Sequence, residues 1–299
     1  GGQRRQMMTT PRYRMSAHGI IFGSLASVCF GTGIVVNKVG LAQSALHPLE
    51  YTALSVIVAG ILGGIMLVPK RAALSSCSRL CVLNILFLGI TASVISYVFL
   101  FWGQSLTKAI NAGFLIALSG FFTMICASVL LKEALEKRQY PFILLLFAGI
   151  YLLTVGTHIL EFNRGDILII IAAMIFGLTN ALSKFAMHEL RGELVASLRL
   201  LVGAVVLLCI LLLRSPQALT ALPGLKGWFV VSGVLMWGFT VCLYRAIEIS
   251  GATMATLVST SYPVVSTIGA VLVLNEGFSV QEIAGGALIV LSIYRLVGQ

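Results

Sequence analysis

The fold is decided by the stretch Ala109–Glu133, AINAGFLIALSGFFTMICASVLLKE, which carries no charge between Lys108 and Lys132. A second stretch, ATMATLVSTSYPVVSTIGAVLVLNE at 252–276, matches it at an offset of 143 and aligns Glu133 with Glu276. Residues 109–156 and 252–299 share ten identities in 48 positions, where composition alone would give roughly four. The chain is therefore predicted to contain two copies of one unit.

Composition predicts that this unit lies in a membrane. The 299 residues are 59% apolar and 10% charged, with a mean hydropathy of +1.02, whereas soluble domains carry about 25% charge. The net charge is +10, but the basic residues sit at the ends of apolar runs and form no stripe with aromatics, which argues against a nucleic-acid partner. Six scattered cysteines form no CxxC or His/Cys cluster, so neither a metal nor a cofactor is expected.

Apolar runs of spanning length predict an all-α membrane protein with ten transmembrane helices, since about 20 residues cross the hydrocarbon core. The runs fall at about 17–37, 49–68, 80–102, 109–131, 140–160, 167–187, 194–213, 227–249, 252–274 and 282–298. They are continuous and lack period-2 alternation, which excludes spanning strands. The first run has membrane-spanning length and no clear cleavage site after it, so we interpret it as a retained helix rather than a signal peptide.

The loops predict the orientation of the helices. If the N-terminus is cytoplasmic, thirteen Lys and Arg residues face the cytoplasm and five face the other side, which predicts a multi-pass protein of the inner membrane with both termini cytoplasmic. Each unit has five helices, an odd number, so the second unit enters the membrane from the opposite side. The two units are therefore predicted to form an inverted repeat.

The predicted divisions are a cytoplasmic tail at 1–16, the first unit at 17–160, a connecting loop at 161–166 and the second unit at 167–299. Helix faces bearing pairs of glycines (Gly19 with Gly23, Gly60 with Gly64) allow close contact in lipid and are compatible with a homodimer.

Short motifs recur between the units and support a resemblance to a known family. At an offset of 146, Phe30-Gly31 aligns with Phe176-Gly177, and Lys38 aligns with Lys184. With Asn37-Lys38, Ser183-Lys184, Tyr262-Pro263, the LNE ending at 274–276 and GGALI at 285–289, the sequence resembles the drug/metabolite transporter superfamily, in particular its EamA-type branch of ten-helix proteins. The resemblance covers residues 17–299. It departs from the family's pattern at Gly120, which stands where Pro263 sits, at Phe142, which stands where Gly285 sits, and at Phe30, where the family often has tryptophan.

The ionisable groups within the apolar runs are basic. No Asp or Glu lies deep in a run, which argues against a carboxylate proton relay and leaves His18 and His158 as the alternatives for proton coupling. The basic residues are Lys38, Lys184, Arg199 and Arg245. Each can either extend to the interface from a helix end or give a cavity a positive potential suited to a carboxylate. Arg199, about five residues into its run, has the strongest claim to the cavity.

Polar and aromatic residues of the runs complete a candidate substrate-binding site. Its predicted members are Asn37, Lys38, Asn84, Tyr97, Trp102, Asn180, Lys184, Arg199, Trp237, Tyr244 and Tyr262. Trp102 and Tyr244 lie near run ends, where an interfacial position is the alternative. Pro263 removes the backbone hydrogen bond to residue 259 and is a candidate gate or hinge, with a static kink as the alternative.

The resemblance implies a carrier of small solutes, and members of the family often export amino acids or other metabolites from the cytoplasm of bacteria. We therefore expect a secondary transporter that exports amino acids, aromatic ones among them, by alternating access at a site between the units. The alternatives are a multidrug or quaternary-cation transporter, which would need a carboxylate at mid-membrane, and a carrier of organic anions or nucleotide-linked solutes. No paired-carboxylate, Ser/His or HExxH arrangement indicates an enzyme, and a structural or receptor-like protein would not need an inverted repeat. The exact solute, the coupling ion, the oligomeric state and the resting conformation do not follow from the sequence.

Overall fold

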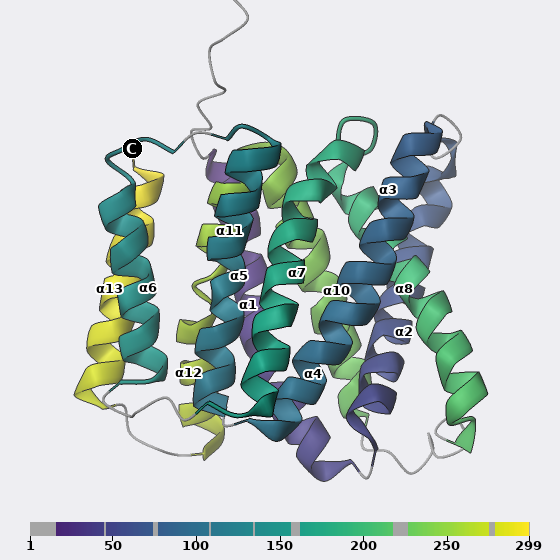
Figure 1. The fold of residues 1–299 in the computed structure, drawn as a ribbon, viewed down its shortest axis with the longest axis horizontal. Helices are drawn as coiled ribbons and strands as arrows, with labels where there is room; N and C mark the ends of the chain where they lie inside the picture. Colours follow the sequence, from purple (N-terminus) through teal and green to yellow (C-terminus); the bar gives the residue numbers. More distant parts are fainter. Residues whose placement is uncertain are drawn as a thin grey trace, which may run out of the picture.

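The computed structural model describes residues 16–44, 46–73, 77–107, 109–133, 135–156, 162–217, 227–274 and 279–298, and every regular element in them is a helix. The first unit contains α1 (Ala17–Gln43), α2 (Pro48–Leu67), the 3₁₀ turn η1 (Val68–Ala73), α3 (Arg79–Ile90), the π-helical η2 (Thr91–Ser96), α4 (Tyr97–Leu106), α5 (Ala109–Leu130) and α6 (Tyr140–Thr154). The second contains α7 (Arg164–Ala186), α8 (Gly192–Arg214), α10 (Trp228–Ser250), α11 (Ala252–Ser259), α12 (Tyr262–Leu274) and α13 (Val280–Val297). The helices stand side by side as a bundle (Figure 1).

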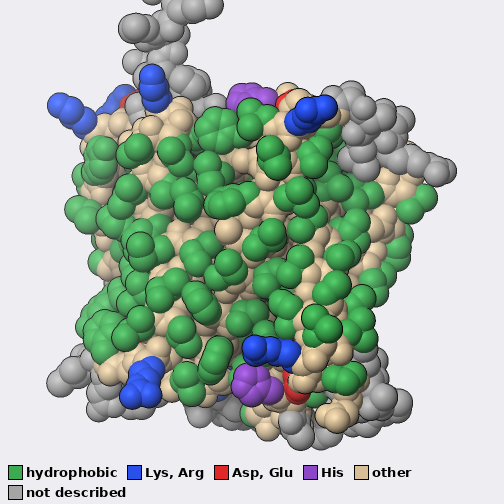
Figure 2. All heavy atoms as spheres, turned by 45° about the vertical axis from the view of Figure 1, so that its right-hand side comes forward, with side chains coloured by type: hydrophobic (Ala, Val, Ile, Leu, Met, Phe, Trp, Pro, Cys, Tyr) green, Lys and Arg blue, Asp and Glu red, His purple; other side chains and the backbone are tan. Residues whose placement is uncertain are grey.

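The predicted spans are recovered; one of them contains a π-helical turn and another is broken. Within the described residues eight helices are long and apolar enough to cross a membrane, and α6 is a shorter apolar helix. The third predicted span is continuous from α3 to α4 through η2, whose wider turn lets Ser93 pack against Gly203 of α8. The ninth is broken between α11 and α12, because Pro263 has no N–H for the carbonyl of residue 259. Hydrophobic side chains cover the middle of the face in Figure 2, and charged and histidine side chains lie near its two ends.

The two units are inverted with respect to each other. Gly19 at the start of α1 lies against Ser250 at the end of α10. Lys184, near the end of α7, donates to the carbonyl of Ile247, also near the end of α10. The first helix of one unit thus begins at the side of the bundle where the first helix of the other ends. Cross-unit pairs build the bundle: α1 packs along α10, α2 along α8, α5 along α7, and α6 along α13, the last pair lying together at the left edge of Figure 1.

The repeated Phe-Gly motif makes equivalent contacts in both units. A Cβ on Gly31 of α1 would lie 2.7 Å from the Cβ of Val265, and one on Gly177 of α7 would lie 2.4 Å from the Cβ of Phe122. Val265 and Phe122 are themselves aligned by the offset of 143. The motif therefore marks the point where the first helix of each unit approaches the helix that contains the other repeated stretch, and only glycine permits that approach.

Replacing Gly177 with alanine is expected to lower the free energy of unfolding by about 1–3 kcal/mol, because the added methyl group would overlap the side chain and backbone of α5. The cost should exceed the gain of about 1 kcal/mol in helix propensity. Gly64→Ala is the matched control, since its Cβ would meet Leu201 at an ordinary 3.7 Å. Thermal unfolding of both variants in detergent measures the difference, and equal melting temperatures would contradict the close-approach argument.

The glycine-bearing helix faces are used within the chain. Cβ atoms on Gly19, Gly23 and Gly60 would meet Ser250, Val258 and Ala204, respectively, at 3.0 Å or closer. The small residues bring α1 against α10 and α11, and α2 against α8. A homodimer would therefore have to form through other surfaces than these faces.

Candidate functional site

Two small chambers lie inside the bundle between the units. We call the first the arginine chamber; it is lined by Phe30, Ile116, Ser119, Phe176, Asn180, Arg199, Phe239, Thr240, Leu243, Tyr244, Thr256, Ser259, Thr260 and Tyr262. The second, the asparagine chamber, is lined by Cys29, Phe30, Gly33, Ile34, Asn37, Tyr97, Leu100, Phe101, Gln104, Ser232, Leu235, Met236 and Phe239. Their volumes are about 30 and 20 Å³, room for a water molecule or two. The state described is therefore closed around its centre.

Two phenylalanines form the partition between the chambers. Phe30 of α1 and Phe239 of α10 line both, with ring centroids 4.5 Å apart. Tyr262, at the start of α12, stands edge-on to Phe30 at 4.7 Å and donates its hydroxyl to the carbonyl oxygen of Gly113. The break before α12 thus places a tyrosine ring beside the partition, where any rearrangement of α11 and α12 would move it.

Arg199 of α8 is the charged group of the arginine chamber and is only 1% exposed. Its Nη1 donates to the hydroxyl oxygen of Tyr244 at 2.6 Å, and its guanidinium carbon lies 4.9 Å from the centroid of that ring. Its Nε has no hydrogen-bond partner among the described residues. The ion pairs within the described residues join their carboxylates to other cations. A buried cation without a carboxylate partner is costly, and an anionic ligand would remove that cost.

A buried carboxylate and a lysine hold the corner where α10 turns into α11. Glu133, only 7% exposed, follows α5 and accepts hydrogen bonds from the N–H groups of Ala252 and Thr253 at 2.9 and 3.0 Å, and from the Thr253 hydroxyl at 2.7 Å. The carboxylate therefore caps the positive N-terminal end of α11. Lys184 donates to the carbonyls of Ile247 and Glu248 at 2.8 and 3.1 Å, at the negative end of α10. Gly251, at φ 84°, makes the turn between the two helices.

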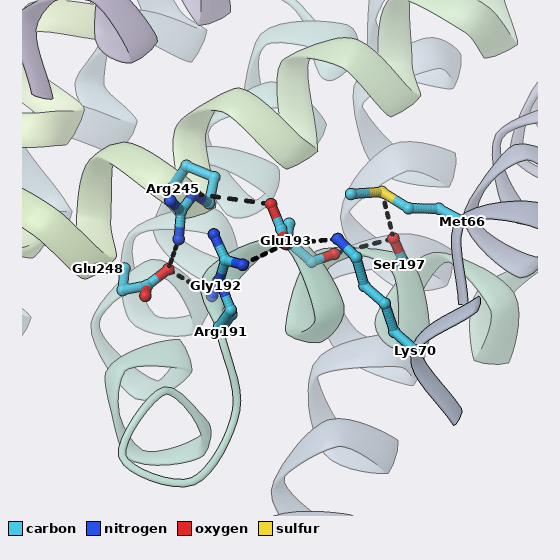
Figure 3. A network of polar contacts seen from close by, with 8 residues as sticks. All are labelled: Met66, Lys70, Arg191, Gly192, Glu193, Ser197, Arg245 and Glu248. Carbon is cyan, nitrogen blue, oxygen red and sulfur yellow. Dashed lines mark hydrogen bonds and ion pairs between the residues drawn. The ribbon is translucent and has the colours of Figure 1, made fainter. Parts of the chain in front are cut away.

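An ionic network joins η1, which follows α2, to α8 and α10 at the same side of the bundle (Figure 3). Glu193 lies 2.6 Å from Lys70, 3.5 Å from Arg191 and 3.7 Å from Arg245. Arg245 also pairs with Glu248 at 2.7 Å, and Glu248 accepts from the N–H of Gly192 at 2.6 Å, the first residue of α8. The network fixes the ends of three helices that line the chambers or support their walls.

A further carboxylate ties the start of α3 to the loop after α7. Ser78 donates its backbone N–H and its hydroxyl to Glu189 at 2.7 and 2.5 Å. These two bonds hold the pKa of the Glu189 carboxyl below its usual range. Within the part of the chain that the structure describes, no three His, Cys, Asp or Glu side chains gather as metal ligands would.

Six of the eleven predicted binding residues line the chambers. Asn37 and Tyr97 lie in the asparagine chamber, and Asn180, Arg199, Tyr244 and Tyr262 lie in the arginine chamber. The other five lie outside both: Lys38 is exposed, Trp102 is 42% exposed beside His47, Lys184 caps α10, and Asn84 and Trp237 are half-buried elsewhere. Pro263 stands at the break that precedes α12, and its role as a hinge stays a prediction.

Several chamber residues were missed because they are common residue types in apolar helices. Phe30 and Phe239 are two of sixteen phenylalanines, and Ser232 has no feature in the sequence that separates it from other helical serines. The only available signal was the repeated Phe-Gly motif, which places Phe30 and Phe176 at equivalent positions, and both rings line the arginine chamber.

Known proteins resemble the chain along most of its length. The model of the EamA-like transporter family matches residues 17–155 and again residues 163–298. An uncharacterized transporter of Methanothermobacter thermautotrophicus is 26% identical, over 95% of this chain and 87% of the relative. Another from Clostridium kluyveri is 22% identical, over 91% of each chain. A solved crystal structure aligns with a TM-score of 0.72 at 18% identity, over 92% of this chain and 94% of that one, and supports the fold alone. Because the family's model covers both halves of the sequence, the chain belongs to the EamA-like transporter family of the drug/metabolite superfamily and is a multi-pass membrane transporter.

Proposed function

We propose that this transporter moves a small carboxylate-bearing metabolite, most readily an amino acid, out of the cytoplasm across the inner membrane. One observation carries the proposal: Arg199 is buried between the units and bonded to Tyr244, but no described carboxylate pairs with it. A guanidinium presents a planar fork of donors that matches a carboxylate. The bias of Lys and Arg between the two sides supports cytoplasmic termini.

The lining of the arginine chamber supports an amino acid with an apolar or aromatic side chain. Phe30, Phe176 and Phe239 contribute rings, and Thr256 and Ser259 contribute hydroxyl groups. Aromatic walls provide a large apolar contact surface for a ring or an alkyl chain. A quaternary-cation substrate would find a guanidinium and no carboxylate among the described residues that line this chamber, so the lining favours acids over cationic drugs. Organic anions and nucleotide-linked solutes share the anion chemistry and are separated by the experiment below.

Alternating access is the mechanism that this arrangement supports. The chambers are closed in the state described and lie between two inverted units, which is where exchange between two conformations would expose them in turn. The ionic network of Glu193 and Glu248 closes one side by joining η1, α8 and α10. Opening toward that side requires those pairs to separate, and the interruption at α11 and α12 provides a joint at which the second repeated stretch can bend.

A thermal-shift screen of the purified protein in detergent, followed by flux measurements in proteoliposomes, tests the proposal. Tyrosine and tyramine, and phenylalanine and phenethylamine, are matched probes that differ only in the carboxylate. The acids are expected to raise the melting temperature, because a ligand at about 100 times its Kd adds about 2.7 kcal/mol to the folded state. Stabilisation by the amines or by quaternary cations, without an effect of the acids, would overturn the proposal. Effects limited to nucleotides or to acids without an amino group would move it to the organic-anion alternative.

A further inference from the structure

We propose that the asparagine chamber is a second subsite, which binds an uncharged hydrogen-bonding group at the far end of a substrate whose carboxylate is held by Arg199. The side-chain hydroxyl of a phenol and the terminal amide of a short side chain are groups of this class. The inference rests on the proposed function, since it takes the arginine chamber as the site of the carboxylate, and it adds the chemistry by which substrates are told apart.

Three helices place buried polar side chains in the lining of this chamber. Asn37 of α1, Tyr97 of α4 and Ser232 of α10 all line it and are 8%, 2% and 2% exposed. The Asn37 Oδ1 lacks a hydrogen-bond partner among the described residues. The Ser232 hydroxyl is within reach of the Tyr51 hydroxyl, and the Tyr97 hydroxyl is within reach of Thr240 and Arg199. A buried polar atom without a partner costs about 1–3 kcal/mol. Packing leaves the Asn37 oxygen unsatisfied, and a ligand that donates a hydrogen bond to it, beside the Tyr97 and Ser232 hydroxyls, would remove that cost.

The charge of the lining limits the ligand group to a neutral one. None of the described residues that line the asparagine chamber is Asp, Glu, Lys or Arg. Apart from the neutral side chains of Gln104 and Cys29, the remaining walls are apolar, with Leu100 and Phe101 among them. A carboxylate or an ammonium would lose its hydration there without gaining a counter-charge, which costs far more than placing a hydroxyl or an amide. The asparagine supplies an amide and the other two residues supply hydroxyls, so the site can both donate and accept.

The partition explains how one substrate can reach both chambers. Phe30 and Phe239 line the two spaces and stand 4.5 Å apart. A substrate with its carboxylate at Arg199 and a polar group in the asparagine chamber would lay its apolar middle against these rings. The preferred substrate is therefore an acid with an apolar stem or ring and a neutral polar end, of which tyrosine and glutamine are examples.

Transport selectivity in proteoliposomes tests the subsite. The probes are tyrosine with phenylalanine and glutamine with norleucine, because each pair differs mainly in the distal polar group. The wild-type protein is expected to prefer the polar member by about 10-fold or more in kcat/KM, since a site built to hydrogen-bond a substrate group discriminates against the analogue that lacks it. Equal values within both pairs would overturn the inference.

Two variants assign the preference to the chamber. Asn37→Leu and Ser232→Ala are each expected to reduce the preference, and together they should bring the ratio close to one. The readout is the ratio between paired substrates, which general damage to the protein does not move. Ser292→Ala is the matched control, because Ser292 is a buried serine of α13 outside both chambers and bonded to the carbonyl of Leu288. A preference that persists in the double variant would overturn the inference. Equal kcat/KM values within both substrate pairs, as expected if only a water molecule occupies the chamber, would also overturn it.

The two proposals fail in different ways. If amines stabilise the protein and acids do not, the proposal that Arg199 binds the substrate carboxylate is wrong. The tyramine and phenethylamine pair then measures the same distal hydroxyl, and a preference that depends on Asn37 and Ser232 would still support the subsite. If acids are moved without regard to their distal group, the proposed function stands and the subsite falls.

Discussion

Replacing Arg199 with alanine is expected to lower kcat/KM for the transported acid by about 100-fold or more, while the protein still folds and inserts. The expected loss is the free energy of a charge-assisted, two-point hydrogen bond in a dry site, and about 100-fold corresponds to about 2.8 kcal/mol. Arg199 is buried, bonded to Tyr244 and unpaired with any described carboxylate. Initial rates of uptake into proteoliposomes measure the change, and size-exclusion profiles in detergent report on folding.

Three companion variants separate charge, geometry and folding. Arg199→Lys keeps the charge but loses the planar fork, so an intermediate loss is expected. Tyr244→Phe removes only the hydroxyl that orients Nη1 and should cost less than Arg199→Ala. Lys38→Ala is the matched control for a cation of an apolar run, since Lys38 is exposed and lies outside both chambers. If well-folded Arg199→Ala transports the acid at the wild-type rate, Arg199 does not bind the substrate carboxylate. If that variant aggregates, Arg199→Gln gives the same comparison with more of the side chain retained.

The sequence was sufficient for the architecture because hydropathy in lipid is a strong signal. Continuous apolar runs require helices, since every backbone polar group must be satisfied within its own segment. The repeat and the odd number of runs per unit then indicated the inversion. The irregular turns were harder to foresee. Pro263 marks the break before α12, but the π-helical turn at 91–96, where Ser93 packs against Gly203, has no comparable residue.

Individual site residues were predictable only where their chemistry is rare in a membrane. Arg199 and Asn180 stand out in apolar runs, and both line a chamber. Lys184 stands out equally, but its side chain reaches the carbonyls at the end of α10, a tertiary contact between residues more than sixty positions apart. The partition shows the same limit, because Phe30 and Phe239 are brought together by the antiparallel packing of α1 and α10. No sequence feature near Phe30 or Phe239 predicts this contact.

Glu133 illustrates a charge whose importance appears only in three dimensions, and its removal is the second large effect expected. Glu133→Ala is expected to lower the free energy of unfolding by about 2–4 kcal/mol, because it leaves two N–H groups and a hydroxyl at the buried start of α11 without their acceptor. The three bonds are 2.7–3.0 Å long and end on one carboxylate. Glu133→Gln should lose less, since the amide keeps one acceptor oxygen while giving up the charge that faces the helix N-terminus.

Thermal unfolding in detergent measures these losses, with Glu136→Ala as the control. Glu136 lies three positions further along and pairs with Arg138, which is 77% exposed, so its removal should change stability by no more than about 1 kcal/mol. Equal melting temperatures for the two alanine variants would contradict the capping role of Glu133. The cap also has a functional consequence, because α11 carries Thr256 and Ser259 into the arginine chamber and leads to Tyr262 beside the partition. A helix start that is less well held should therefore let these chamber walls shift, so Glu133→Gln is expected to weaken the binding of the acid as well as the fold.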